Sequence, residues 1–328
     1  MCIRDSYYGM RGLLILYLTQ HFLFSDEKSS VMYGAYTALV YIMTIVGGTL
    51  ADRYLGQRKA VTFGAILLVL GHFGMAFEGS GSKEIMTYDG AEYQLTLDGR
   101  GGDANQIIIS DTGESQISFN EGATAMIIAD PAAVGLPAEI SRDAYTTRIE
   151  REEMYVYILY LSLALIIAGV GYLKANISTI VGALYGIEDK RRDSGFTLFY
   201  MGINLGSFLS SITCGILGIV YGWAWGFGLA GIGMGLGLVV FLWGQSWLEG
   251  KADPPSVEKL KEKVLGPINV ELACYLAGIG IIAVSMLIVM NSEIIPDWFV
   301  GGLGLLVLAG LIVYTVVNLQ GVERDRMF

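Results

Sequence analysis

Long apolar runs recur along the chain and alternate with short polar stretches. Eight such runs cover residues 7–24, 31–51, 60–77, 155–185, 196–219, 224–247, 269–290 and 298–319. Because about 20 apolar residues let a helix cross the roughly 30 Å of hydrocarbon in a bilayer, each run predicts one transmembrane helix. The pattern therefore predicts an all-α polytopic membrane protein.

Residues 78–153 break this pattern. Short stretches such as EYQLTLDG and NQIIIS alternate apolar with polar residues between Gly and Asp turns, which predicts a small β-rich module. The segment holds 15 Asp and Glu against 5 Lys and Arg, so its net charge of −10 equals that of the whole chain. We expect an acidic spacer; the alternative is a partner or ligand site, because long ordered insertions are often functional.

Composition agrees with the membrane prediction. Hydrophobic residues make up 53% of the chain and charged residues only 16%, which is typical of lipid-embedded helices. The three cysteines, Cys2, Cys214 and Cys274, show neither paired nor ligand-like spacing, so we expect no disulfide framework and no metal site. No serine or carboxylate pattern singles out either histidine, His21 or His72, which disfavours an intramembrane hydrolase, so we expect no enzyme. We also expect no cofactor and no nucleic-acid partner.

Basic residues orient the predicted helices. They gather in three connecting stretches: Arg53, Arg58 and Lys59; Lys190, Arg191 and Arg192; and Lys251, Lys259, Lys261 and Lys263. Because cytoplasmic loops carry an excess of Lys and Arg, these stretches are predicted to face the cytoplasm. The acidic segment 78–153 then lies on the extracytoplasmic side.

Two cations lie inside apolar runs. Lys174 is the single charge between Tyr155 and Gly186, and an ammonium at that depth is costly unless it faces a water-filled cavity or a partner. We interpret Lys174 as a ligand-binding cation; the alternative is a structural pair with a neighbouring helix. Arg11 shares a helix face with Tyr7, so the two could hold a carboxylate together, unless Arg11 extends to the lipid headgroups.

Five motifs follow one another in a fixed order. They are YYGMR (7–11), GGTLADRYLGQRK (47–59), GYLKANIS (171–178), FTLFYMGINLGSF (196–208) and YGWAWGFGLAGIGMGLGL (221–238). Together they resemble the signatures of proton-dependent oligopeptide transporters, a family of the major facilitator superfamily. The resemblance covers nearly all of the chain except the 78–150 insertion and the first six residues.

This resemblance implies a domain organisation. It implies an N-terminal six-helix bundle, followed by the extra helix pair that bacterial members insert between their two halves. The expected units are helices one to three with the first truncated (1–77), the extracytoplasmic β-rich insertion (78–153), helices four to six (154–248), a cytoplasmic linker (249–268), the extra helix pair (269–319) and the start of a linker to a C-terminal half (320–328).

The resemblance also implies a function and a site. Members carry di- and tripeptides with protons by alternating access, so the expected partners are small peptides, the lipid bilayer and the C-terminal half, with the proton as coupling ion. The substrate residues implied by the motifs are Tyr7, Tyr8, Arg11, Tyr41, Lys174 and Asn204. The loop after the second run implies the gating residues Asp52, Arg53 and Arg58.

Two departures from the family pattern change the expectation. Arg4 stands where the arginine of the family's ExxER motif falls, but Ile3 replaces its second glutamate. The sequence ends at Phe328, before the family's second half. We therefore expect an N-terminal fragment of a bacterial inner-membrane transporter that is inactive alone. The alternatives are a carrier of a non-peptide solute and a membrane-anchored interaction protein whose 78–150 insertion binds a periplasmic partner.

Overall fold

The computed structural model describes residues 2–100, 104–186, 188–294 and 297–318. Within these residues each of the eight predicted apolar runs coincides with a helix except for a few residues at its ends, which confirms the helical prediction. The long helices are α1 (Cys2–Leu16), α2 (Asp26–Leu50), α3 (Gln57–Met75), α5 (Glu153–Leu184), α6 (Arg192–Val220), α7 (Trp223–Trp243), α9 (Val270–Met290) and α10 (Asp297–Asn318).

Five stretches of the described residues are long and apolar enough to cross a membrane. They are 26–75, 153–184, 192–220, 223–248 and 270–290, and the first of them contains both α2 and α3. Their length and composition support a multi-pass membrane protein.

Some helix boundaries differ from the prediction. Helix α1 begins at Cys2 rather than near Tyr7, and it continues into a π-helical turn, Tyr17–His21. The polar start of α1 has no apolar pattern of its own, but α1 packs along α6 and α7, and such packing contributes more to helix stability than local propensity does. Helix α6 likewise begins at Arg192 instead of 196, because polar residues extend a helix beyond its apolar part.

The predicted linker 249–268 contains structure that the sequence pattern did not indicate. A short helix, α8 (Val257–Lys261), precedes the hairpin of β8 (Lys263–Leu265) and β9 (Ile268–Asn269). Both elements are shorter than the windows over which hydrophobic periodicity can be recognised. The predicted linker 320–328 lies outside the described residues.

Helix α5 lies at the centre of the bundle and packs against α2, α3 and α9. Its contact with α2 depends on glycine: a Cβ placed on Gly47 would lie 2.3 Å from the carbonyl oxygen of Gly171. Small residues of this kind let two helix backbones touch inside a membrane. The buried Asn176 strengthens the same contact, since its Nδ2 donates to the carbonyl oxygens of Tyr172 at 2.7 Å and Gly47 at 3.4 Å.

The alternating segment forms a seven-stranded antiparallel sheet in the order β6-β5-β4-β3-β2-β1-β7. One face of the sheet forms a separate core around the fully buried Met86, Ile108 and Met126. A short helix, α4 (Pro131–Val134), lies between β5 and β6. The strands are β1 (Lys83–Tyr88), β2 (Ala91–Asp98), β3 (Asn105–Ile109), β4 (Glu114–Phe119), β5 (Ala125–Ile128), β6 (Glu139–Ser141) and β7 (Tyr145–Glu150).

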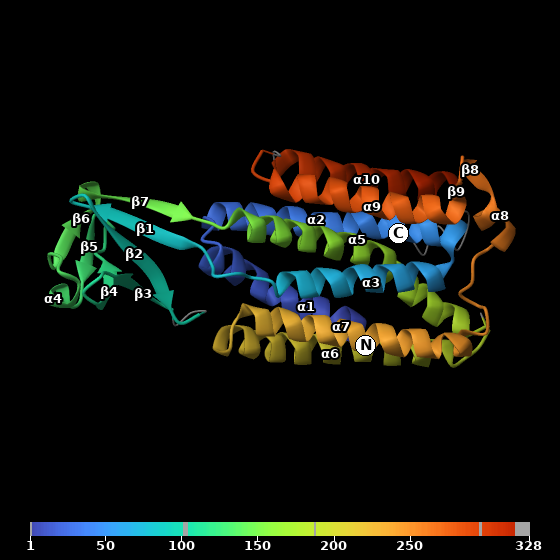
Figure 1. Cartoon of the computed structure of the whole chain (residues 1–328). Coiled ribbons are helices and arrows are strands. Elements are labelled where there is room, and N and C mark those ends of the chain that lie inside the picture. The colour runs from blue at the N-terminus through green and yellow to red at the C-terminus, as the bar shows by residue number, and fades with distance from the viewer. Residues whose placement is uncertain (1, 101–103, 187, 295–296, 319–328) are drawn as a thin grey trace.

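The sheet lies at one end of the bundle, whereas α8 and the β8–β9 hairpin lie at the other end (Figure 1). Arg151 ties the sheet to the bundle, because its Nε and Nη2 each donate at 2.7 Å to the carbonyl oxygens of Phe22 and Leu23. The end that carries α8 also holds the basic loop between α2 and α3, so basic and acidic segments occupy opposite ends, as the orientation argument requires.

Candidate functional site

Lys174 contacts an aromatic ring on a neighbouring helix. Its Nζ lies 3.9 Å from the centre of the Tyr41 ring, which joins α5 to α2. Lys174 is half-buried, and Tyr41 is 54% exposed. A cation over an aromatic face is stabilised by the ring quadrupole, more so where water is scarce. The structure therefore brings together two residues that the sequence placed in one site.

The backbone around Lys174 explains its position. Gly171, one turn earlier in α5, lies directly against α2 through its close approach to Gly47. Because side chains three and four residues apart lie on the same helix face, Lys174 follows Gly171 along the face that meets α2. The close approach of the two helices thus holds the ammonium over the Tyr41 ring.

Arg11 also contacts a tyrosine of α2. Its Nε donates to the hydroxyl of Tyr33, and its Cζ lies 5.4 Å from the centre of that ring. The sequence had suggested Tyr7 as the partner, but the side chains of Tyr7 and Tyr8 lie outside the described residues. Sequence analysis did not identify Tyr33 as a partner of Arg11. Tyr33 precedes Tyr41 in α2 by eight residues, so the two side chains lie about 12 Å apart along the helix axis.

Asn204 occupies a different environment. It is exposed on α6, whereas Gly202 and Ile203 just before it are buried. The next turns of α6 meet α1, where a Cβ on Gly9 would lie 3.0 Å from the Sγ of Cys214. Asn204 therefore lies on an exposed face of α6.

The predicted gating residues do not pair with one another. The Asp52 carboxylate accepts from Nε2 of Gln57 at 2.9 Å, and Arg53 is exposed. Arg58 instead pairs with Asp253, with 2.7 Å between Nε and Oδ1. The reason is the turn between α2 and α3: Gly56 has a φ of +73°, and it redirects the chain so that the start of α3 meets the segment after α7.

The motif loop is thereby connected to two other parts of the chain. The backbone N–H of Arg58 donates to the carbonyl oxygen of Ala252 at 2.9 Å, next to the ion pair with Asp253. Lys59, also in the motif, pairs with Glu271 at the start of α9, with 2.5 Å between Nζ and Oε1. The loop therefore joins α3 to the segment after α7 and to α9 at the basic end of the bundle.

A half-buried carboxyl, Glu78, lies where the sheet meets the bundle, and the sequence pattern gave no sign of it. Burial raises the pKa of Glu78, while the backbone N–H of Ala224 and the charge of Arg100 act in the opposite direction. Among the described residues, its Oε2 has no hydrogen-bond partner. The junction between sheet and bundle thus contains a carboxyl whose pKa is raised by burial.

Comparison with known families shows which protein family the chain belongs to. The model of the family described as "POT family" matches residues 58–268, which is more than half of the chain. The chain belongs to the POT family. Members of the POT family are transporters and not enzymes, so both the resemblance carried by the five motifs and the prediction of a non-enzyme are confirmed.

Individual relatives agree with the family assignment. An uncharacterized transporter of Bacillus subtilis, YclF, is 28% identical over 88% of this chain and 43% of its own length. Dipeptide and tripeptide permease A of Pectobacterium carotovorum is 24% identical over 99% of this chain and 48% of its own. A crystal structure of the peptide transporter POT in complex with sulfate is 27% identical, with a TM-score of 0.59, and covers 99% of this chain and 52% of that one.

The share of each relative's length that this chain matches is as informative as the sequence identity. This POT chain spans about half the length of the curated relatives it matches. It is a helical, multi-pass membrane protein of a transporter family. The chain also contains a seven-stranded sheet.

Proposed function

We propose that this chain forms the N-terminal half of a symporter that carries di- and tripeptides together with protons by alternating access. Two findings support the proposal: membership of the POT family, and relatives named as peptide transporters that are about twice as long. In such transporters two helical bundles move against each other around a midplane site. The proton is the coupling ion, and no cofactor is required.

The observation that carries the proposal is the contact of Lys174 with Tyr41. The Tyr41 ring is half exposed and the Lys174 side chain is half-buried, so the pair is not sealed inside the bundle. The guanidinium of Arg11 in α1 lies over the ring of Tyr33 in α2 and is a second cation beside that helix. Two cations on one bundle favour a ligand carboxylate, because an Arg or Lys that bonds a carboxylate makes a strong, charge-assisted hydrogen bond. The second half would then supply the group that binds the peptide ammonium.

The motif loop has a separate role in this proposal. The ion pairs Arg58–Asp253 and Lys59–Glu271 join α3 to neighbouring segments at the basic end of the bundle. Pairs of this kind are able to hold helix ends together in one transport state and to separate in the other. We assign Arg58 and Lys59 to this latch; Asp52 supports the turn through Gln57.

We also propose an orientation. The basic end faces the cytoplasm of a bacterial cell, in keeping with the excess of Lys and Arg that cytoplasmic loops carry. The sheet, at the opposite end, then lies in the periplasm.

Uptake measurements test the proposal. The longer polypeptide that it requires is purified with residues 1–328 as its first half, and is reconstituted into liposomes with an imposed pH gradient. Uptake of radiolabelled dialanine should rise with an acidic exterior and should fall when unlabelled tripeptide competes. Competition by a small anion such as nitrate, with none by peptides, would contradict the peptide assignment. Absence of any uptake, together with capture of a periplasmic protein by the sheet, would favour an interaction protein.

A further inference from the structure

The seven-stranded sheet curls back on itself. Its two edge strands, β6 and β7, are separated in sequence only by the 3₁₀ turn Arg142–Ala144. In a flat sheet, six strand spacings of about 4.8 Å would put the edges about 29 Å apart. The four peptide units from Ser141 to Tyr145 reach at most about 14 Å. The sheet must therefore bend into a partly closed barrel with a concave face.

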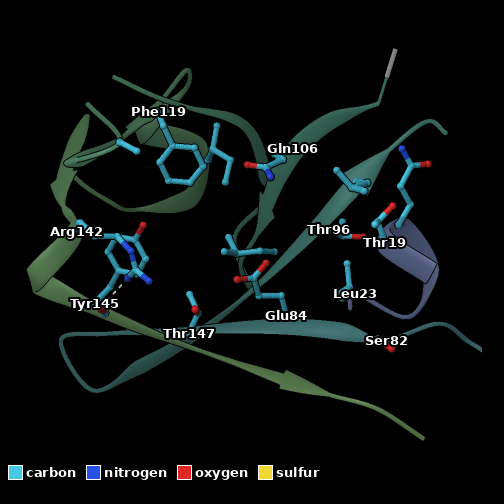
Figure 2. A pocket seen from close by; sticks show the side chains of 15 residues that line it. Thr19, Leu23, Ser82, Glu84, Thr96, Gln106, Phe119, Arg142, Tyr145 and Thr147 are labelled. Carbon is cyan, nitrogen blue, oxygen red and sulfur yellow. Dashed lines mark hydrogen bonds between the residues drawn. The ribbon is translucent and has the colours of Figure 1, made fainter. Parts of the chain in front are cut away.

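The concave face is only partly filled. Met86, Ile108 and Met126 occupy it without exposure to solvent. Beside them lies a cavity of about 360 Å³, lined by side chains of β1, β2, β3, β4 and β7, with Thr19 and Leu23 on the side of the bundle (Figure 2). This volume lies within the range of small-molecule sites, about 300 to 1,000 Å³.

Two of the polar side chains that line the cavity come from β1 and β3. Glu84 lies two residues before Met86 in β1, and Gln106 lies two residues before Ile108 in β3. Because residues two apart in a strand lie on the same face of the sheet, all four face inward. Figure 2 shows Glu84 and Gln106 pointing into the cavity from their strands. Glu84 lines the cavity with a half-buried carboxylate, and a carboxylate makes strong, charge-assisted hydrogen bonds with a cation, so Glu84 favours a ligand that carries one.

The rest of the lining adds an aromatic surface and a positive charge. Phe119 is 41% exposed, and it lines the cavity together with Ile117 of the same strand. Arg142 lies at one end, 4.7 Å from the centre of the Tyr145 ring, with its backbone N–H bonded to the carbonyl oxygen of Thr124 at 2.8 Å. A ligand that spans the cavity would meet a carboxylate, then an apolar wall, then a guanidinium.

We infer that this cavity binds a zwitterion of about dipeptide size, with its ammonium on Glu84, its apolar side chain against Phe119 and its carboxylate at Arg142. The net charge of −10 on residues 78–153 disfavours anions and raises the local concentration of ligands with an exposed ammonium. The inference rests on the sheet alone and does not depend on the proposed transport function.

Methionine NMR tests this inference in the whole chain. Residues 1–328 are labelled with ¹³C-methyl methionine in detergent and are titrated with leucyl-leucine. Met126 is the cross-strand partner of Phe119, so its methyl resonance should shift and saturate. No saturable shift at Met126 would overturn the inference.

Variants and analogues of the probe identify the contacts. Glu84→Gln should weaken binding by about tenfold or more, as expected for loss of a charge-assisted bond. Glu114→Gln, which makes the same change on the exposed outer face of β4, should leave binding unchanged. Phe119→Ala should weaken binding, whereas Ile127→Ala on the outer face should not. An unchanged Met86 methyl resonance shows that each variant is folded.

The analogues separate a zwitterion from a simple amine. N-acetylation of leucyl-leucine should abolish the shift, and C-terminal amidation should weaken binding about as much as Arg142→Ala does. Equal binding of the acetylated probe, or equal affinities of the Glu84→Gln and Glu114→Gln variants, would contradict the assignment. Lys174→Ala should leave the Met126 shift intact, so failure of the transport proposal and failure of this inference are distinguishable.

Discussion

Lys174 of α5 holds its ammonium 3.9 Å from the centre of the Tyr41 ring on α2. The pair joins two helices whose backbones touch at Gly47 and Gly171. It also leaves the ring half exposed, so the same contact is able to support the fold and to present a cation to a ligand. Whether substrate binding or helix pairing dominates is decided by variants that separate the two.

The Tyr41 ring, rather than its hydroxyl, is expected to matter for Lys174. In the full-length transporter, Tyr41→Phe keeps the aromatic face and should retain most of the peptide affinity. Tyr41→Ala removes a cation–π contact of about 0.5 to 2 kcal/mol, so it should weaken peptide binding roughly 2- to 30-fold. Peptide titration of the reconstituted protein measures both. Equal loss in the two variants would show that the hydroxyl, not the ring, is the functional group.

Residues 1–328 alone should insert into a membrane and carry nothing. The reason is that alternating access needs two bundles, and this chain matches about half of its relatives. The chain is reconstituted into liposomes, and uptake of labelled dialanine is measured under an imposed pH gradient. Peptide uptake above that of empty liposomes would refute the half-transporter proposal.

The acidic sheet should be accessible from outside the cell. Ser118 is exposed on β4, so Ser118→Cys in a chain without its native cysteines should react with an impermeant thiol reagent in intact spheroplasts. Lys261→Cys, at the basic end of the molecule, should react only after lysis. The opposite pattern of labelling would reverse the proposed orientation.

Glu78 should make the stability of the chain depend on pH. Burial raises its pKa in the folded state above the ordinary value of 4.5, so the folded chain binds this proton more readily than the unfolded chain does. Stability is therefore lost as the pH rises from the ordinary pKa through the raised one. Glu78→Gln should melt above the parent protein at about pH 8, and this difference should shrink as the pH falls towards about 4.

Melting curves over this pH range provide the measurement. Glu114→Gln is the matched control, because it removes the same charge from an exposed position of the sheet. A difference in melting temperature that is constant with pH, or one that grows on acidification, would show that the pKa of Glu78 is not raised in the folded chain.

Much of the fold follows from the sequence because periodicity is a local property. Apolar runs near membrane-spanning length predicted the helices, and period-two alternation predicted strands in residues 78–153. Closure of the sheet into a partial barrel was not predictable, since the position of β7 beside β1 is a long-range choice that alternation does not encode. For the same reason the inward-facing Glu84 had no visible significance before the cavity was known.

The candidate site was predictable to a similar degree. A lone charge in an apolar run singled out Lys174, and the motif pattern added Tyr41, which the structure places against it. The partner of Arg11 was missed, because contacts between helices depend on how each helix is rotated. The ion pair of Arg58 with Asp253 was missed because the two residues are far apart in the sequence.

The account depends most directly on Lys174 as a ligand-binding cation. Proton-driven peptide uptake and melting temperature are measured together for the full-length transporter, for Lys174→Ala and for Lys174→Arg. We predict no uptake and an unchanged melting temperature for Lys174→Ala. Lys174→Arg should bind peptide but should transport poorly, because a guanidinium keeps its charge and cannot release a proton. A lower melting temperature in Lys174→Ala that Lys174→Arg restores together with uptake would indicate a structural pair, and full uptake by Lys174→Ala would contradict the account outright.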